Sequence, residues 1–508
     1  MASWPFAPPD REAGHARDHL IVRFRPDIFR VSAVGEEWDA VLAGLGLPAG
    51  AELLNGSFQV LAGPPRPVGA TRRQVADTDL SRRFFLRLPP GVEAAECATR
   101  LARHPRLAYV ELDGIGRAAL TIPSDPNFPD QWHHHNTAHS NGAVRADIHT
   151  PAAWDITRGS SNVVVALLDS GINASLAEFA GRILPGYDFV RGDNNPNDET
   201  GHGTAIAAIL AANANNAAAV AGVDWNCRLM PLKVVDANDL FFDSWVADAL
   251  DWATTNGCKV INLSVGKYES SQSITEAITN AIARGLIVIS LTSNDGTNQI
   301  SFPGSLPEVI TVGATDQSDR RAEFSNYGTQ IDLVAPGTGI CTLNREGGLW
   351  FPDGTSASAP MVAGVAALLA AVRPDIDNEM AHTFLCAGAD DQVGVALEDT
   401  PGFDIHHGWG RLNAYNSLIL AQTRLQHVQV TPNRQLIFSW NCPANAEARQ
   451  PYRIEFSNAL SGPWQTLPAH PEINYSGTIA SWIDDLSLTG GPAGALKDKF
   501  FRIRIVLP

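Results

Sequence analysis

The sequence predicts an α/β protein built on a mainly parallel sheet with helices covering both faces. Apolar runs of strand length alternate with helical patterns across residues 162–292, as expected for a parallel sheet. The flanking regions differ: residues 15–116 mix strand patterns with one helix, and residues 425–508 hold strand patterns alone. We therefore expect an α+β domain at 15–116, an α/β domain at 125–422 and an all-β sandwich at 425–508.

Composition narrows the class of protein. With 508 residues, 44% of them hydrophobic and 18% charged, the chain is long enough for two to four globular domains. Its net charge of −17 argues against nucleic acid or an anionic membrane as a partner. Residues 1–18 contain no apolar core of signal-peptide length, and no apolar run approaches a membrane span without Pro, Gly or charge. Neither an export signal nor a membrane span is expected in the chain as given.

Two residue types that often mark metal sites have simpler interpretations here. The six cysteines are scattered along the chain without C-x-x-C pairs, so we expect buried thiols and not a disulfide framework. His133, His134 and His135 are consecutive and cannot all face one site from a regular strand or helix. We expect them to lie at the surface beside a packed Trp132.

The N-terminal region is predicted to form a compact two-layer module. Its expected strands and helix are, in order, Leu20–Arg25, Phe84–Leu88, the helix Glu93–Arg103 and Leu107–Glu111. Between the strands, Gly63–Asp79 contains Pro and Arg and is predicted to be a surface loop. After Gly114 the chain becomes irregular and proline-containing, which places a domain boundary there.

The central region supplies the alternation that predicts the parallel sheet. Its expected strands are Asn162–Leu168, Leu229–Val235, Lys259–Ser264 and Leu286–Thr292. Its expected helices are Thr204–Ala212, Ser244–Thr255 and Ser273–Ala283. Functional residues collect at the carboxyl ends of the strands in such sheets, so polar residues at those ends are the first candidates.

Four residues follow that rule. Asp169 ends the first strand, His202 begins an Ala-rich helix between two glycines, and Asn294 follows the last strand. Ser356 precedes a long apolar helix, with Pro360 in the first turn, where a missing amide proton costs nothing. Each alone has a structural explanation as a turn residue or a helix cap. Their combination indicates a catalytic centre.

These motifs resemble those of the subtilisin-like serine proteases, or subtilases. The matching phrases, in the Asp, His, Ser order of that family, are Asp169-Ser170-Gly171, Gly201-His202-Gly203-Thr204, Asn294 and Gly354-Thr355-Ser356-Ala357-Ser358-Ala359-Pro360. The supporting phrases are Lys259–Ser264, Phe324–Gly328, Ala335–Gly337 and Gly408–Ala414. Together they cover about residues 125–420.

The resemblance implies a serine endopeptidase that hydrolyses polypeptides through an acyl-enzyme and acts as a monomer. Ser356 would attack the scissile carbonyl while His202 takes its proton, and Asp169 would hold the imidazole in the required tautomer. The Asn294 side-chain amide and the backbone N–H of Ser356 would bind the oxyanion.

The resemblance also implies a substrate groove. Ser264, Val265 and Gly266 would form an edge onto which an extended peptide adds as a strand. Ser293 stands where relatives commonly have glycine, so its side chain is expected to narrow the primary pocket.

Calcium is a common structural cofactor in the family, and two oxygen-rich segments are candidates. One is the run 193–199, which contains Asp193 and Asp198. The other combines Glu178 with the loop 213–216, including Asn216, and with Gln131. No organic cofactor is expected.

The flanking regions gain roles from the same resemblance. Residues 15–116 would act as an intramolecular inhibitor, with the segment 114–124 leaving through the active-site cleft and being cut by the enzyme itself. The resemblance implies secretion, with the cytoplasm as the alternative because the chain shows no signal peptide. The C-terminal strands loosely resemble fibronectin type III appendages, for which packing and adhesion are the alternative roles. They are expected at Val428–Val430, Leu436–Trp440, Tyr452–Phe456, Thr478–Trp482 and Phe500–Val506.

Two other classes of function remain as alternatives. An α/β-hydrolase esterase would pair Ser356 with Asp390 and His407, but its nucleophile elbow requires G-x-S-x-G, and Ser358 occupies the last position. A non-catalytic protease-like binding module would keep the fold without the reaction. A serine-directed phosphonate separates that module from an enzyme.

Overall fold

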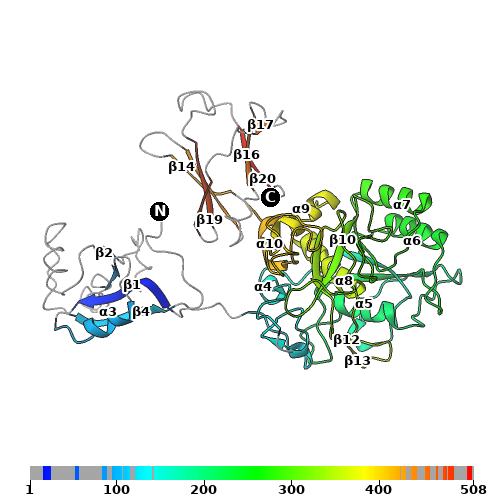
Figure 1. The fold of residues 1–508 in the computed structure, drawn as a ribbon, viewed down its shortest axis with the longest axis horizontal. Coiled ribbons are helices and arrows are strands. Elements are labelled where there is room, and N and C mark those ends of the chain that lie inside the picture. Colours follow the sequence, from blue (N-terminus) through cyan, green and yellow to red (C-terminus); the bar gives the residue numbers. More distant parts are fainter. Residues whose placement is uncertain are drawn as a thin grey trace, which may run out of the picture. The chain divides into compact units, whose positions relative to one another are not determined.

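The computed structural model describes residues 15–24, 52–55, 83–88, 94–105, 107–114, 120–139, 142–423, 425–430, 436–442, 452–457, 465–466, 473–476, 479–484 and 500–505. The chain divides into two compact units, Met1–Ala119 and Leu120–Pro508. Figure 1 shows the elements of both units.

The first unit contains an antiparallel sheet and a helix. Its strands lie in the order β2 (Glu52–Asn55), β3 (Arg83–Arg87), β1 (His15–Phe24) and β4 (Leu107–Gly114). Helix α3 (Ala94–Leu101) buries Ala94, Cys97 and Leu101, which recur at helical spacing on one face. The expected strands and helix are present at nearly the expected positions, and β2 was not expected. The predicted loop Gly63–Asp79 lies outside the described residues.

The second unit is organised around a seven-stranded parallel sheet (Figure 1). In spatial order the strands are β11 (Leu333–Pro336), β10 (Ile310–Thr315), β9 (Ile287–Leu291), β8 (Val260–Leu263), β5 (Val164–Asp169), β7 (Arg228–Lys233) and β6 (Tyr187–Asp188). The four strands predicted in this region are therefore confirmed.

Helices cover both faces of this sheet, as the fold prediction requires. Along β5, Val165 and Leu167 enter one apolar cluster, which includes side chains of α5 (His202–Ala211) and α8 (Thr355–Val372). The alternate residues of β5 enter a second cluster with α6 (Asp243–Thr255) and α7 (Gln272–Ala283). Because successive side chains of a strand point to opposite faces, two separate clusters require two covered faces.

Helix α8 is the central helix of the unit. Within the described residues it alone has the length and hydropathy of a membrane span, and 83% of it is buried inside the protein. Its burial identifies it as a core helix, which explains why its sequence is apolar on all sides.

The remaining elements are short or lie toward the C-terminus. The helices are α4 (Thr150–Ala153), α9 (Asn378–Gly388), α10 (Ala414–Ala421) and the 3-10 turns Phe128–Asp130 and Ala177–Phe179. Strands β12 (Thr342–Leu343) and β13 (Leu349–Trp350) form a hairpin. Two antiparallel sheets follow, one with β14 (Leu425–Val430), β15 (Leu436–Asn441), β19 (Ile479–Asp484) and β18 (Ile473–Ser476), the other with β17 (Gln465–Thr466), β16 (Tyr452–Ser457) and β20 (Phe500–Ile505).

The interpretation of the three histidines is wrong in part. Trp132 is packed as expected, but His133 and His134 are also fully buried. The ring of His134 pairs with Thr150 Oγ1 at 2.8 Å and with the carbonyl of Ala221 at 3.0 Å. Burial lowers the pKa of His134 to about 4, against the opposing hydrogen bond to Ala221, so both partners are held by a neutral imidazole.

The cysteine prediction is confirmed. All six cysteines are buried, and none is in a disulfide.

Candidate active site

Asp169 and His202 form the first part of the site. Asp169 is the last residue of β5 and is only 1% exposed, and His202 is the first residue of α5. The Nδ1 atom of His202 lies 2.7 Å from Oδ1 of Asp169, which also accepts the N–H of Ser170 at 2.7 Å. A carboxylate can only accept, so Nδ1 carries the proton. The other ring nitrogen, Nε2, is thereby left as an acceptor on a side chain that is 35% exposed.

Electrostatics favour the protonated form of this imidazole. Burial lowers the pKa of His202, but the charge of Asp169 and its hydrogen bond outweigh that effect, with help from Asp198 and Asp239. The net result is a pKa above the usual value for histidine. His202 is therefore prepared to take up a proton and stabilise it beside Asp169.

A buried polar network fixes the start of α5. Oδ1 of Asp198 accepts from the hydroxyl of Ser170 at 2.8 Å and from the N–H of Gly201 at 2.9 Å, while Oδ2 accepts from the hydroxyl of Thr204 at 2.6 Å. The hydroxyl of Ser170 in turn accepts the N–H of Gly203 at 2.9 Å. This network ties the helix that carries His202 to the strand end that carries Asp169.

Asn294 and Ser356 form the second part of the site. Oδ1 of Asn294 accepts from the backbone N–H of Thr355 at 2.8 Å and from its hydroxyl at 2.9 Å. That orientation turns Nδ2 of Asn294 toward Gly354, where a Cβ atom would lie 3.5 Å from Nδ2, 3.1 Å from Ser356 Oγ and 3.7 Å from Ser356 N. The φ of 155° at Gly354 is suited to glycine. One hydroxyl and two N–H donors therefore converge on the space left free by this glycine.

The two parts come from the same edge of the sheet. Asp169 ends β5, and Asn294 follows β9 in the same parallel sheet. Among the described residues, no hydrogen bond joins His202 to Ser356. Ser358, the other serine of the motif, is fully buried and donates to the carbonyls of Ala335 and Pro336 at 3.1 Å and 3.0 Å.

Asn326 is a positioning residue whose role the sequence did not reveal. Its Oδ1 accepts from the backbone N–H groups of Asp295 at 2.9 Å and Thr297 at 3.1 Å, and its own N–H donates to Ser293 at 3.0 Å. It thus holds the turn that presents Asn294. The phrase Phe324–Gly328 marked the segment, but spacing alone does not say which turn a side chain supports.

Of the expected groove residues, Gly266 lies opposite Ser293 and also lines a cavity. Ser293 adopts a φ of 82°, and its hydroxyl donates to Ser301 Oγ at 2.8 Å. That hydroxyl is 3.1 Å from where a Cβ of Gly266 would lie, so Ser293 and Gly266 face each other. Ser264 accepts from Asn262 at 2.8 Å and is 8% exposed, and Val265 is 7% exposed, so neither offers much side-chain surface. A cavity of about 660 Å³, lined by Gly266, Lys267 and residues 239–244, adjoins them.

The two candidate calcium segments differ in how their oxygens are used. Asp198 serves the α5 network, and Asp193 accepts the N–H of Asn195 at 2.8 Å in a local turn, so these two do not form a common ligand set. Glu178 is 5% exposed and accepts from Asn216 Nδ2 at 3.0 Å. Burial raises the pKa of Glu178, more than Asn216 lowers it, and nearby Asp125 raises it further. Two buried carboxylates thus share this second segment. Gln131, also expected there, instead pairs with the backbone of Ala221 at 2.8 Å.

The esterase alternative fails on geometry. Oδ2 of Asp390 pairs with Arg411 at 2.8 Å and with His149 at 3.2 Å. His407 pairs with the backbone carbonyl of Asp319 at 3.3 Å. Asp390 and His407 therefore serve other partners.

Comparison with known proteins agrees with this geometry. The subtilase family profile matches residues 160–410. The chain is 35% identical over 356 residues to a thermophilic serine proteinase of Bacillus sp. (strain AK1), covering 70% of this chain and 82% of that protein. It is 32% identical to thermitase of Thermoactinomyces vulgaris, covering 53% of this chain and 93% of thermitase. A solved protease structure from Pseudoalteromonas arctica superposes with a TM-score of 0.54 at 29% identity, covering 59% of this chain and all of that one.

The fold, the strand-end polar residues and these similarities agree on one assignment. The chain belongs to the subtilase family and is a serine-type endopeptidase.

Proposed function

We propose that Asp169, His202 and Ser356 form the catalytic triad and that Asn294 completes the oxyanion hole. The observation that carries this proposal is the pairing of His202 Nδ1 with Asp169 at 2.7 Å, which leaves Nε2 as the proton acceptor. Its complement is the convergence of Ser356 Oγ and two N–H donors at Gly354. Both features lie at the carboxyl edge of one parallel sheet.

In the proposed reaction, Ser356 Oγ attacks the carbonyl carbon of a peptide bond while Nε2 of His202 takes the hydroxyl proton. The imidazolium that forms is stabilised by Asp169, and its proton passes to the leaving amine as the C–N bond breaks. An acyl-enzyme remains. Water then attacks its ester carbonyl while His202 takes a proton from the water, and that proton passes to Ser356 Oγ as the ester bond breaks. In the free enzyme the His–Ser contact is often long and closes only with substrate bound.

The oxyanion would form where Asn294 Nδ2 and Ser356 N converge. Asn294 is preorganised because its Oδ1 is already held by Thr355, so no side-chain rotation is needed as charge develops. Ser356 N also lies in the first turn of α8, where the helix dipole favours negative charge.

A phosphonate label tests the nucleophile. The mature protein is expected to gain one phosphonyl group at Ser356, detected by peptide mass spectrometry, and Ser356→Ala is expected to abolish both labelling and peptide hydrolysis. Ser358→Ala is the matched control, because Ser358 is a buried neighbour that bonds only to backbone carbonyls. Absence of label in the folded wild-type protein would favour the non-catalytic binding module.

We also propose that the substrate is an extended polypeptide bound along Ser264–Gly266. The hydroxyl of Ser293 faces Gly266, which favours a small side chain at the cleaved position. Leu240 and Phe242 are each 64% exposed beside the adjoining cavity, which favours apolar side chains further along the substrate. A peptide-library cleavage profile tests both preferences. Ser293→Gly is expected to admit larger side chains at the cleaved position.

The proposed zymogen uses residues 15–116 as an inhibitor that the enzyme removes itself. Thr121 donates to Asp155 through its N–H at 3.2 Å and its hydroxyl at 2.5 Å, and Ser124 N donates to Asn215 at 3.1 Å. The chain from Thr121 onward is thus held by the second unit, so we place the cut before Thr121. Ser356→Ala is expected to remain full length in pure solution. Processing of that variant at the wild-type rate would exclude self-cleavage.

Calcium is proposed at the Glu178 segment and not at Asp193 and Asp198. Two buried carboxylates, Glu178 and Asp125, together with loop oxygens are suited to a hard divalent cation. Adding Ca²⁺ to the chelated protein is expected to raise its melting temperature. That Ca²⁺-dependent rise should disappear in Glu178→Gln and persist in Asp193→Asn.

A further inference from the structure

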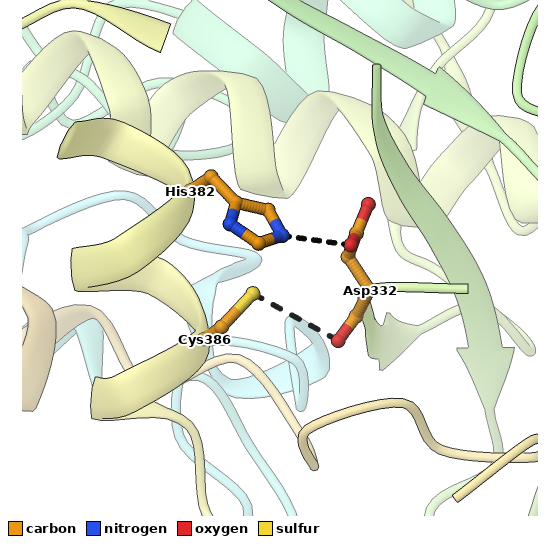
Figure 2. Close-up of side chains that lie close together, drawn as sticks. All are labelled: Asp332, His382 and Cys386. Carbon is orange, nitrogen blue, oxygen red and sulfur yellow. Dashed lines mark hydrogen bonds and ion pairs between the residues drawn. The ribbon is translucent and has the colours of Figure 1, made fainter. Parts of the chain in front are cut away.

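A second cluster of reactive side chains lies away from the proposed catalytic residues. Figure 2 shows His382 and Cys386 on one helix, α9, with both side chains directed toward Asp332, which directly precedes β11. The spacing of four residues places the histidine and the cysteine on the same helix face, one turn apart. Nε2 of His382 lies 2.8 Å from Oδ1 of Asp332. The thiol of Cys386 lies 3.9 Å from the backbone carbonyl of Asp332.

This cluster lies at the amino ends of the parallel strands, whereas Asp169 lies at their carboxyl ends. Asp332 stands at the amino end of β11, whereas Asp169 stands at the carboxyl end of β5, and the strands of this sheet are parallel. The peptidase reaction therefore gives these three side chains no role.

The three side chains offer a ligand set of one nitrogen, one sulfur and one oxygen. One ligand atom from each lies within 4.8 Å of the other two. Imidazole, thiolate and carboxylate are the ligands that Zn²⁺ uses in proteins, at about 2.0–2.3 Å. Ligand atoms around such an ion are about 3.3–3.5 Å apart in tetrahedral geometry, so small side-chain rotations are enough to bring the cluster to that spacing.

Burial around the cluster is graded in a way that suits a metal site. Cys386 is fully buried, which keeps its sulfur away from bulk water, while the side chains of His382 and Asp332 are 28% and 17% exposed. The exposed side offers an entry path and room for water as a fourth ligand. Oδ2 of Asp332 accepts the N–H of Thr311 at 2.7 Å, which fixes the carboxylate while Oδ1 faces His382.

We propose that Asp332, His382 and Cys386 form a binding site for Zn²⁺ or a similar divalent transition metal. The ion replaces the thiol proton of Cys386 and the proton that His382 Nε2 shares with Asp332, while His382 keeps a proton on Nδ1 and binds as a neutral imidazole; the displaced protons pass to solvent. Its structural effect is to join α9 to the start of β11, two segments that are 50 residues apart at His382 and Asp332. The proposal is independent of the assignment of the catalytic residues.

Cobalt is the probe of choice, because Co²⁺ takes zinc sites and its bond to a thiolate gives a charge-transfer absorption band. The experiment uses the full chain carrying Ser356→Ala to prevent self-digestion, freed of metal by a chelator. Titration with Co²⁺ is expected to produce the thiolate band at one equivalent, and Zn²⁺ is expected to remove it. The melting temperature should rise with Zn²⁺ concentration, because an ion that binds only the folded state stabilises it.

Two variants test the sulfur and nitrogen ligands, and a third serves as a matched control. Cys386→Ser is expected to abolish the band, whereas Cys341→Ser, at another buried cysteine, should retain it. His382→Gln is expected to weaken Co²⁺ binding at least tenfold, because loss of a residue that merely orients a ligand already costs about 10–100-fold in metal affinity. The cluster of Asp399, Asp404 and His407 contains no sulfur, so cobalt bound there gives no such band.

The outcomes divide cleanly. A band that survives Cys386→Ser, or a Ser356→Ala parent protein that shows no band and no Zn²⁺-dependent rise in melting temperature, overturns the proposal. Loss of the band in a variant counts only if its circular dichroism matches that of the parent, and His382→Gln provides a second route if Cys386→Ser misfolds.

Discussion

Among the described residues, the two shortest Asp–His pairs are nearly equal in length. His202 lies 2.7 Å from Asp169, and His382 lies 2.8 Å from Asp332. The first pair bonds through Nδ1, which leaves Nε2 available near a serine-bearing helix, whereas the second bonds through Nε2 itself and has a thiol one turn along its helix. The pair alone therefore does not define a function. In the proposed roles, the ring nitrogen that is engaged and the third side chain in the cluster distinguish proton transfer from metal binding.

The largest expected difference between the two pairs is in kcat, when the histidine of each pair is replaced by alanine. His202→Ala is expected to lower kcat by about 10⁶-fold, the size found for the equivalent loss in subtilisin. His382→Ala should leave phosphonate labelling of Ser356 intact and lower the melting temperature in the presence of Zn²⁺. For both purified variants, kcat is measured with a chromogenic peptide, labelling by mass spectrometry and the melting temperature by thermal unfolding. Equal losses of kcat from the two changes would contradict the division of roles.

The next contrast concerns the acid of the first pair. Asp169→Asn is expected to lower kcat by about 10⁴-fold, because an amide no longer selects the required tautomer of His202. The measurement is kcat with a saturating peptide at the pH optimum. A loss of less than tenfold would show that the Asp169 contact is structural.

Removing the amide of Asn294 should have a smaller effect. Asn294→Ala is expected to lower kcat by about 10²–10³-fold, the size measured in subtilisin itself, with little change in KM. Steady-state kinetics separate the two parameters. A rise in KM at constant kcat would place Asn294 in substrate binding instead.

The pH profile tests the electrostatics of the pair. A general base must be neutral, so kcat/KM should rise with pH until His202 has lost its proton. Since Asp169 raises the pKa of His202, this acid limb should lie above pH 6.5, the ordinary value. Asp169→Asn should move the limb to lower pH. A limb that stays in place in that variant would assign it to another group.

The smallest expected effect concerns the support of α5. Ser170→Ala leaves the N–H of Gly203 without its partner in a buried position, which costs about 1–3 kcal/mol of stability. Urea unfolding of the Ser356→Ala background measures it. Thr255→Ala is the control, because that exposed hydroxyl bonds only to its own helix and to the adjacent Asn256. A similar loss from both would mean that the α5 network contributes no special stability.

Much of the catalytic region could be predicted because its signals are local. Apolar runs at strand length gave β5, β7, β8 and β9 within two residues, and strand ends gave Asp169 and Asn294. Periodicity works here because both faces of the sheet are covered, so each strand is apolar throughout.

The sequence pattern does not predict the remaining features, and the cause is shared: the spacing of residues along the chain does not reveal contacts between residues that are far apart in sequence. Spacing places Asp198 in an oxygen-rich loop but does not reveal that it bonds Ser170 and Thr204 at the start of α5. The prediction that His133 and His134 lie at the surface is wrong, because three adjacent polar rings in the sequence do not reveal the buried environment that receives them. The sequence does not point to Asp332 or His382, because neither lies at the carboxyl end of a strand.

The two buried histidines beside Trp132 make the stability of the fold sensitive to acid. Both are held neutral in the folded chain, with the pKa of His134 lowered to about 4, whereas in the unfolded chain they would titrate near 6.5. Below pH 6.5 these two histidines therefore bind more protons in the unfolded chain than in the folded one, so their contribution to the free energy of unfolding falls as the pH drops toward 4. Through these two histidines, acid weakens the fold independently of any protonation of His202. A molecule that digests its own unfolded copies would turn that weakening into irreversible loss.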